Sequence, residues 1–197
     1  MKRRDLLLSG LVVGAALHVA PALAAAPALK AGVFEPPLPA PELGLQGSDG
    51  ADLKLSRFRG KVVAVVFGFT QCQAVCPVTL YTLAQARKAM GAEAAGVQVV
   101  FITVDPARDD AQRVRGFLTG FDPSFIGGTG RPDAVAAVEQ RFGVSAKKVP
   151  MSNGDYAVDH SSAVYLIDRE GRLRAMMPFG HGAQDYVHDF RLLLAQR

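Results

Sequence analysis

Residues 61–77 of the chain read KVVAVVFGFTQCQAVCP. The first seven residues are a nearly continuous apolar run, rich in β-branched side chains and ended by Gly68, which is typical of a strand buried on both faces. Pro77 suits the first position of a helix, and residues 78–90 contain no helix breaker before Gly91. We therefore expect a central strand joined to a helix by a loop that carries both cysteines of the chain.

The rest of the sequence completes an α/β order. Residues 97–104 predict a second buried strand, and a strand–helix–strand crossover of this kind is right-handed with parallel strands. Residues 162–167 and 172–177 predict an antiparallel hairpin. Further helices are expected after Asp109-Asp110, from Pro132 and over residues 183–195, with Gly127-Gly128-Thr129-Gly130 as the loop between the first two. This order predicts a thioredoxin-like α/β fold with a central mixed β-sheet flanked by helices.

The composition limits the classes of protein to consider. The chain has 197 residues, 49% of them hydrophobic and 20% charged, which indicates one globular domain and excludes a disordered or rod-like protein. The net charge is 22 − 18 = +4, and residues 2–5 supply +2 of it, which argues against a nucleic-acid partner. Two cysteines exclude a disulfide-rich scaffold and a four-thiolate zinc module.

The N-terminus has the order of a signal peptide. Lys2-Arg3-Arg4 precedes an apolar run over residues 6–19 and a small-x-small cleavage site, so we expect a signal peptide over residues 1–24 that resembles the twin-arginine type. Residues 25–41 are rich in Ala and Pro and predict an extended, poorly packed linker before a domain over residues 42–197. The domain is expected to be periplasmic or otherwise exported. Membrane contact is expected only if the N-terminal segment stays uncleaved as an anchor in the inner membrane.

Cys72 and Cys76 lie at the expected start of the helix, where the positive end of the helix dipole lowers the pKa of a thiol. A disulfide closing a ring of about five residues would stabilise the chain by only ~2 kcal/mol, so a structural role is disfavoured. Two functions stay open for the pair. One is disulfide exchange, although a Cys-x-x-Cys motif would have one fewer intervening residue. The other is binding of a soft metal such as Cu(I), in a trigonal site completed by one imidazole.

His160 is the candidate for that imidazole. It lies just before residues 162–167, and in this fold that loop faces the N-terminus of the active-site helix. His18 lies in the expected signal peptide, and His181 and His188 lack this placement. Three methionines are expected to belong to the core rather than the site, namely Met151, Met176 and Met177.

Four motifs in order carry a family resemblance. They are Phe67-Gly-Phe-Thr-x-Cys-x-x-x-Cys-Pro, Thr103-Val-Asp-Pro-x-Arg-Asp109, Gly127-Gly-Thr-Gly130 and Tyr156-x-Val-Asp-His160. With these motifs in this order, the chain resembles the SCO/SenC family over nearly all of residues 42–197. The resemblance implies a thioredoxin-like domain that binds copper, as Cu(I), Cu(II) or both, through Cys72, Cys76 and His160. When oxidised, Cys72 and Cys76 are expected to form a redox disulfide.

The resemblance also implies a function. The expected role is that of a metallochaperone, with no catalytic turnover required, that delivers copper to the binuclear copper centre of cytochrome c oxidase or otherwise matures it. The expected partners are the copper-bearing subunit of that oxidase or another copper chaperone. The alternative is a thiol-disulfide reductase that keeps a partner's copper-ligand cysteines reduced, with His160 as a proton-transfer group. A peroxide-reducing activity is disfavoured, because it would need a single exposed attacking cysteine.

The chain departs from the family between the cysteines. Family members commonly have Cys-Pro-Asp-x-Cys-Pro, whereas this chain has Cys72-Gln-Ala-Val-Cys76-Pro77 and so lacks the proline and the acidic residue. Loss of a like charge beside two thiolates favours their ionisation. Asp159 could orient His160 unless its side chain points away in an extended segment. Three polar residues of the second motif are expected to organise a loop, namely Asp105, Arg108 and Asp109.

Overall fold

The computed structural model describes residues 28–152 and 154–196. The signal peptide expected over residues 1–24 lies outside these ranges and stays a prediction. Among the helices of the described ranges, none combines the length and apolar character that a membrane span requires.

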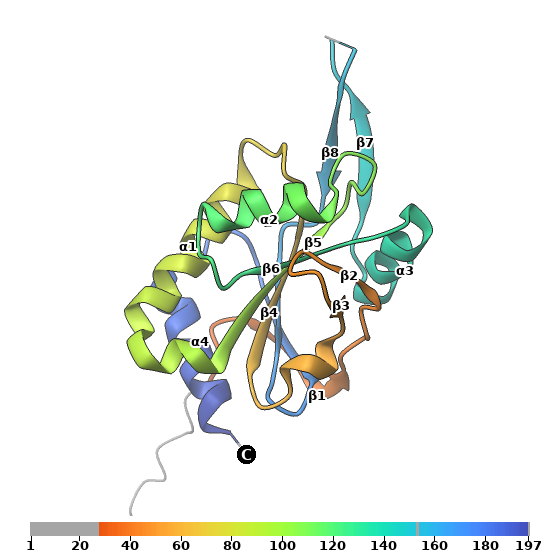
Figure 1. Cartoon of the computed structure of the whole chain (residues 1–197). Helices are drawn as coiled ribbons and strands as arrows, with labels where there is room; N and C mark the ends of the chain where they lie inside the picture. Colours follow the sequence, from red (N-terminus) through yellow and green to blue (C-terminus); the bar gives the residue numbers. More distant parts are fainter. Residues whose placement is uncertain (1–27, 153, 197) are drawn as a thin grey trace, which may run out of the picture.

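A mixed eight-stranded sheet runs through the middle of the described chain (Figure 1). In spatial order its strands are β1 (Gly32–Pro39), β10 (Arg172–Met177), β9 (Val164–Ile167), β4 (Val62–Gly68), β5 (Val97–Thr103), β6 (Ile126–Thr129), β2 (Leu45–Gly47) and β3 (Asp52–Leu53). β4 pairs in parallel with β5, as does β5 with β6, whereas β9 runs antiparallel to β4 and β10. All residues of β4 and β5 are buried. The two predicted central strands and the predicted hairpin are therefore confirmed.

Helices cover both faces of this sheet. The helical segments are α1 (Val75–Met90), α2 (Ala111–Thr119), α3 (Pro132–Phe142) and α4 (Ala183–Ala195), with short 3-10 helices η1 (Leu55–Phe58) and η2 (Gly91–Gly96). Because side chains alternate along a strand, Val62, Ala64 and Val66 pack with α1, α2 and α4, whereas Val63 and Val65 pack with α3 and η1. The architecture is the predicted one, an α/β fold whose mixed sheet is flanked by helices.

The predicted loop at residues 127–130 is wrong, because residues 126–129 form β6. Gly127 and Gly128 are buried where other elements come very close to the strand. A Cβ atom on Gly127 would lie 2.0 Å from Cγ1 of Val114 in α2, and one on Gly128 would lie 2.5 Å from Cδ2 of Leu53 in β3. The glycines therefore permit close packing of a strand rather than ending one.

Part of the linker expected over residues 25–41 belongs to the main sheet. Of its described residues, 28–41, most are exposed, but residues 32–39 form the edge strand β1 and pair antiparallel with β10. The prolines are tolerated there because an edge strand leaves N–H positions unpaired, and the register shifts between Val33 and Leu38. The buried carboxylate of Asp189 in α4 also accepts hydrogen bonds from the amides of Lys30 and Ala31, at 2.7 and 2.9 Å. The folded part therefore begins well before Glu42.

The long polar stretch before the hairpin contains an unpredicted two-stranded sheet. β7 (Ala146–Pro150) and β8 (Tyr156–His160) pair antiparallel and project from the body of the molecule (Figure 1). Most residues of β7 are exposed and carry little apolar pattern, so no periodicity marks this strand in the sequence. His160 is the last residue of β8, so the arm carries the candidate ligand.

Two glycine substitutions test the account of β6. Gly127→Ala would drive a methyl group into Val114, and overpacking of this kind costs about 1–3 kcal/mol of unfolding free energy. Gly116→Ala is the matched control, because it lies in α2 with nothing within 4 Å of an added Cβ, and it should stabilise the protein by about 0.5–1 kcal/mol. Denaturant unfolding measures both changes. Equal stability of the two variants would contradict the close approach of α2 to β6.

Candidate metal centre

Helix α1 begins earlier than predicted, and this decides where the thiols lie. Its first residue is Val75 and its N-cap is Ala74, so Cys76 is the second residue of the helix and lies in its first turn, close to the N-cap as predicted. Pro77 is tolerated in this first turn because its missing N–H would have no intrahelical partner there. Cys76 is buried, and a Cβ atom on Gly68 would lie 2.8 Å from its Sγ. The end of β4 must therefore remain a glycine to leave room for this sulfur.

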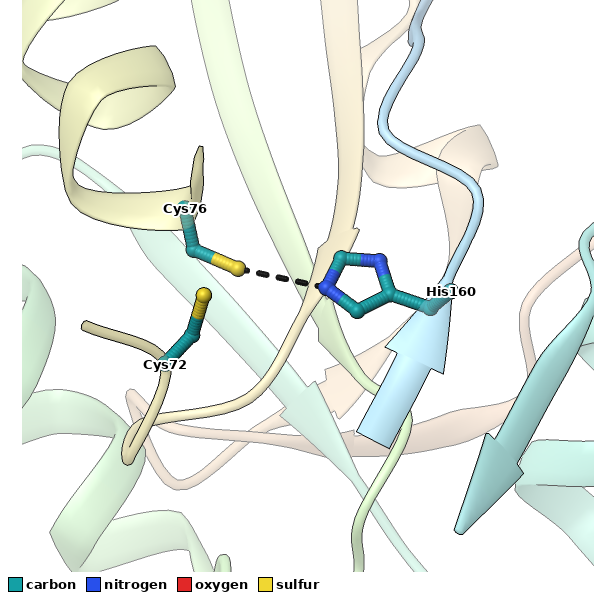
Figure 2. Close-up of side chains that lie close together, drawn as sticks. All are labelled: Cys72, Cys76 and His160. Carbon is teal, nitrogen blue, oxygen red and sulfur yellow. Dashed lines mark hydrogen bonds between the residues drawn. The ribbon is translucent and has the colours of Figure 1, made fainter. Parts of the chain in front are cut away.

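The three predicted ligands meet at one point. The Sγ atoms of Cys72 and Cys76 and a ring nitrogen of His160 all lie within 4.8 Å of one another. Figure 2 shows the Cys76 thiol directed toward the imidazole, with 3.4 Å between Cys76 Sγ and His160 Nε2, and the Cys72 thiol directed toward the Cys76 sulfur. Within the described ranges, this is the one cluster of at least three His, Cys, Asp or Glu side chains that could hold a metal ion.

The orientation of the imidazole suits a ligand. Nδ1 of His160 lies 2.8 Å from the carbonyl oxygen of Ser161, and a contact with an acceptor requires Nδ1 to carry the proton and donate it. Nε2 then faces the thiols with a free lone pair. The ring of Phe69 lies edge-on to the imidazole at 5.9 Å between centroids. The backbone carbonyl, and not Asp159, therefore orients the ring.

The two thiols differ in exposure and in acidity. Cys72 is half-buried, and its pKa is lowered to about 4, first by a hydrogen bond from the Cys76 thiol and then by the backbone N–H groups of Cys76, Ala74 and Val75, against an opposing contribution from burial. The pKa of Cys76 is raised, because its proton is held in that hydrogen bond and because the group is buried. The pair therefore shares one proton, with the negative charge on Cys72. Both cysteines are free thiols, so the redox disulfide stays a prediction.

Asp109 holds the cysteine loop in place, as expected of a loop-organising residue. Its buried carboxylate accepts hydrogen bonds from the amide and hydroxyl of Thr70, at 2.9 and 2.6 Å, and from the hydroxyl of Thr103, at 2.7 Å. Asp110 alone caps α2, by accepting from the amide of Arg113. This role of Thr70 was not predicted from the sequence, although the residue lies inside the first family motif.

The remaining candidates lie apart from the cluster. His181 pairs with Asp185 at 3.0 Å, and His188 pairs with Asp189 at 2.9 Å. The methionine prediction is correct for Met177, which is buried, and wrong for Met151 and Met176, which are exposed. The site within the described residues therefore offers two sulfurs and one imidazole nitrogen, a donor set for a soft or borderline metal ion.

Solved structures share this architecture. The apo Sco1 protein of Thermus thermophilus is 34% identical, with a TM-score of 0.77 over 86% of this chain and 99% of that one. A structure of Bradyrhizobium japonicum ScoI with copper bound is 33% identical, with a TM-score of 0.73 over 78% of this chain and 98% of that one. The predicted thioredoxin-like fold is thus confirmed.

Sequence comparison points the same way. The human "Protein SCO2 homolog, mitochondrial" is 40% identical over 148 residues, which are 70% of this chain and 56% of the relative. The chain likewise covers only 55% of the mouse counterpart and 62% of an SCO2-like protein of Rickettsia prowazekii. The family model described as SCO1/SenC matches residues 40–195, nearly all of the described chain. The chain therefore belongs to the SCO1/SenC family.

Proposed function

We propose that this protein is an exported metallochaperone that binds copper through Cys72, Cys76 and His160 and serves the maturation of the binuclear copper centre of cytochrome c oxidase. The observation that carries the proposal is the convergence of two thiols and one imidazole within 4.8 Å. Relatives solved with copper bound, from Bradyrhizobium japonicum and yeast, support the choice of metal. The family resemblance supports the choice of client, either the copper-bearing oxidase subunit or another copper chaperone.

The chemistry of the donors suits copper as a cargo. Thiolates favour Cu(I), whereas Cu(II) takes imidazole readily, so the set can serve either oxidation state. Cys76 must lose its proton to become a ligand, and metal binding at such a thiol releases a proton. Cys72 is half-buried and is the thiol that a partner reaches first. Stepwise exchange of ligands with a partner's thiolates would therefore begin at Cys72.

The proposed location is the periplasm or another exported compartment. It rests on the signal peptide expected over residues 1–24, and an uncleaved segment would anchor the domain to the inner membrane instead. An oxidising compartment of this kind favours disulfides, so the dithiol would need a reductant there before it could accept copper.

The unequal thiols favour a second candidate, a thiol-disulfide reductase. The Cys72 thiolate would attack one sulfur of a partner's disulfide, forming a mixed disulfide and releasing the other sulfur as a thiolate. Cys76 would lose its proton, with His160 Nε2 at 3.4 Å as the acceptor, and attack Cys72. The partner then leaves fully reduced by two electrons, and the chain carries the Cys72–Cys76 disulfide. A dithiol donor would have to reduce it again.

Copper titration of both redox forms tests the metal site. Reduced protein should bind one copper per chain. The disulfide form should bind none tightly until it is reduced, because cysteine sulfur coordinates the metal as a thiolate and not as a disulfide. The measurement is competition against a chelator, with the visible spectrum recorded. A chain with Cys72→Ser and Cys76→Ser serves as control and should fold but bind no tight copper. Equal binding by both redox forms would rule out a two-thiolate site.

Replacement of the histidine separates the chaperone from the reductase. His160→Ala should still bind Cu(I), because two thiolates satisfy that ion. Its Cu(II) affinity should fall by more than about 100-fold, because removing a ligand costs more than removing a residue that only hydrogen-bonds a ligand. The thiolate-to-copper absorption should disappear with it. His181→Ala and His188→Ala are matched controls and should retain both copper states. Parental copper binding by His160→Ala, together with loss of disulfide reduction, would favour the reductase over the chaperone.

The pH dependence of alkylation tests the shared proton. Because the pKa of Cys72 is lowered to about 4, its thiolate persists above that pH, and alkylation by iodoacetamide should occur at Cys72 with a rate nearly constant between about pH 6 and 8. Ala74→Asp would place a carboxylate at the N-cap, where it repels the thiolate and competes for the same N–H groups, so the profile should move to higher pH.

Gln73→Asp is the control for that variant, since it adds the same charge one residue away from the N-cap. It should move the alkylation profile less than Ala74→Asp does. Mass spectrometry identifies the alkylated cysteine. Preferential alkylation of Cys76, or a rate that rises tenfold per pH unit across this range, would contradict a thiolate held at Cys72.

A further inference from the structure

The candidate site joins two parts of the fold that share no sheet. Both thiols follow β4 of the large sheet, whereas His160 ends β8 of the separate β7–β8 sheet. Backbone pairing with the large sheet resumes only at Val164 of β9, which lies opposite Val66 of β4, so it limits but does not by itself fix the distance between the sulfurs and the imidazole. Buried Val158 packs into the core beneath the arm, but apolar packing has no directional preference. Directional contacts between β8 and the loop after β5 come from side chains at the base of the arm.

Arg108, in the loop between β5 and α2, makes those contacts. Its Nη1 donates to the backbone carbonyl of Tyr156 at 2.9 Å and to the carboxylate of Asp155 at 3.0 Å. Its guanidinium lies 3.7 Å from the centre of the Tyr156 ring, a stacking distance. Arg108 thus holds the first residue of β8 by both its backbone and its side chain.

The same arginine is tied to the cysteine side of the site. Its Nε donates to Asp105, a buried carboxylate that also accepts a hydrogen bond from the Tyr156 hydroxyl at 2.8 Å. The guanidinium lies 5.8 Å from the ring of Phe69, which in turn contacts the imidazole of His160 edge-on. The backbone carbonyl of Phe69 also accepts a hydrogen bond from the amide of Cys72, at 3.1 Å. The Arg108 side chain therefore contacts both Tyr156 in the β7–β8 arm and Phe69 beside the cysteines.

From this arrangement we infer that Arg108 is a positioning residue, which sets the place of His160 relative to the two thiols through Tyr156 and Phe69. The inference rests on the proposed copper site and adds a residue that is not itself a ligand. Since two thiolates satisfy Cu(I) without the imidazole, loss of Arg108 affects the two oxidation states unequally. Cu(II) binding depends on the position of β8, and Cu(I) binding does not.

Arg108→Lys tests this inference, because lysine keeps the charge but loses the planar fork and the stacking. Cu(II) affinity should fall about 10–100-fold, the usual effect of disturbing a ligand's support, and the thiolate-to-copper absorption should weaken. Cu(I) affinity should stay within about threefold of the parent. In the metal-free protein, hydrogen exchange should accelerate at the amides of β7 and β8, and the NMR cross-peaks between the Phe69 and His160 rings should weaken.

Arg87→Lys is the matched control. The Arg87 side chain is 13% exposed, against 16% for Arg108, and it also bonds a carboxylate and a carbonyl, namely Asp122 at 3.1 Å and Ala94 at 2.7 Å. It lies in the last turn of α1, whereas Cys76 lies in the first. Arg87→Lys should lower stability to a similar extent and leave both copper affinities, the spectrum and the exchange of β8 unchanged.

Tyr156→Phe keeps the experiment decisive if Arg108→Lys does not fold. It removes only the hydroxyl that donates to Asp105 and should produce a smaller effect in the same direction. The inference would be overturned if Arg108→Lys showed the Cu(II) affinity of the parent and the same hydrogen exchange in β8. If only Tyr156→Phe folds, the same two results in that variant would overturn it. If even the parent binds no copper, the proposed function fails, while the exchange and NMR measurements on metal-free protein still decide whether Arg108 positions His160.

Discussion

The parallel pairing of β4 with β5 places the parts of the site that lie on the large sheet. Gly68 lies opposite Thr103 in this pair, and the amide of Val104 donates to the carbonyl of Gly68 at 2.7 Å, which extends the pairing past the end of the strands. Because the carboxyl ends of parallel strands meet at one edge, the loop with the cysteines and the loop with Asp109 are neighbours. The carboxylate of Asp109 then bonds both loops at once, through Thr70 and Thr103.

The start of α1 explains why the dithiol is suited to a metal. The N-cap residue, Ala74, has no side chain that could accept the first N–H groups, and the backbone N–H groups of Ala74, Val75 and Cys76 lower the pKa of the nearby Cys72 thiol instead. A thiol with a lowered pKa is a good leaving group, so a disulfide that contains it is readily reduced. The same N–H groups that stabilise the thiolate as a ligand therefore favour the reduced form of the pair, which is the form able to bind copper.

The central strands and the ligands were predictable because each carries a local signal. β4 and β5 are continuous β-branched runs, and the two cysteines stand between a strand and a helix. β6 was missed because Gly127 suggests a turn, whereas its real constraint is Val114, which approaches from α2 and is distant in sequence. The β7–β8 arm was missed because β7 is mostly exposed and the arm contacts the body through residues distant in sequence, such as Arg108, which donates to the Tyr156 carbonyl. Such tertiary contacts between distant residues leave no periodicity in the sequence.

A site divided between the sheet and the β7–β8 arm would link the proposed copper chemistry to the binding of a partner. The imidazole matters more to Cu(II) than to Cu(I), so the position of β8 sets the preference between the two states. A partner that binds the arm and shifts it would change the affinity for Cu(II). Thermodynamic reciprocity then requires Cu(II) to change the affinity for the partner by the same factor. A site built wholly on the central strands would lack this coupling, because those strands are buried and paired on both edges. In the proposed chaperone, the projecting arm would therefore be a physical route from partner contact to metal release.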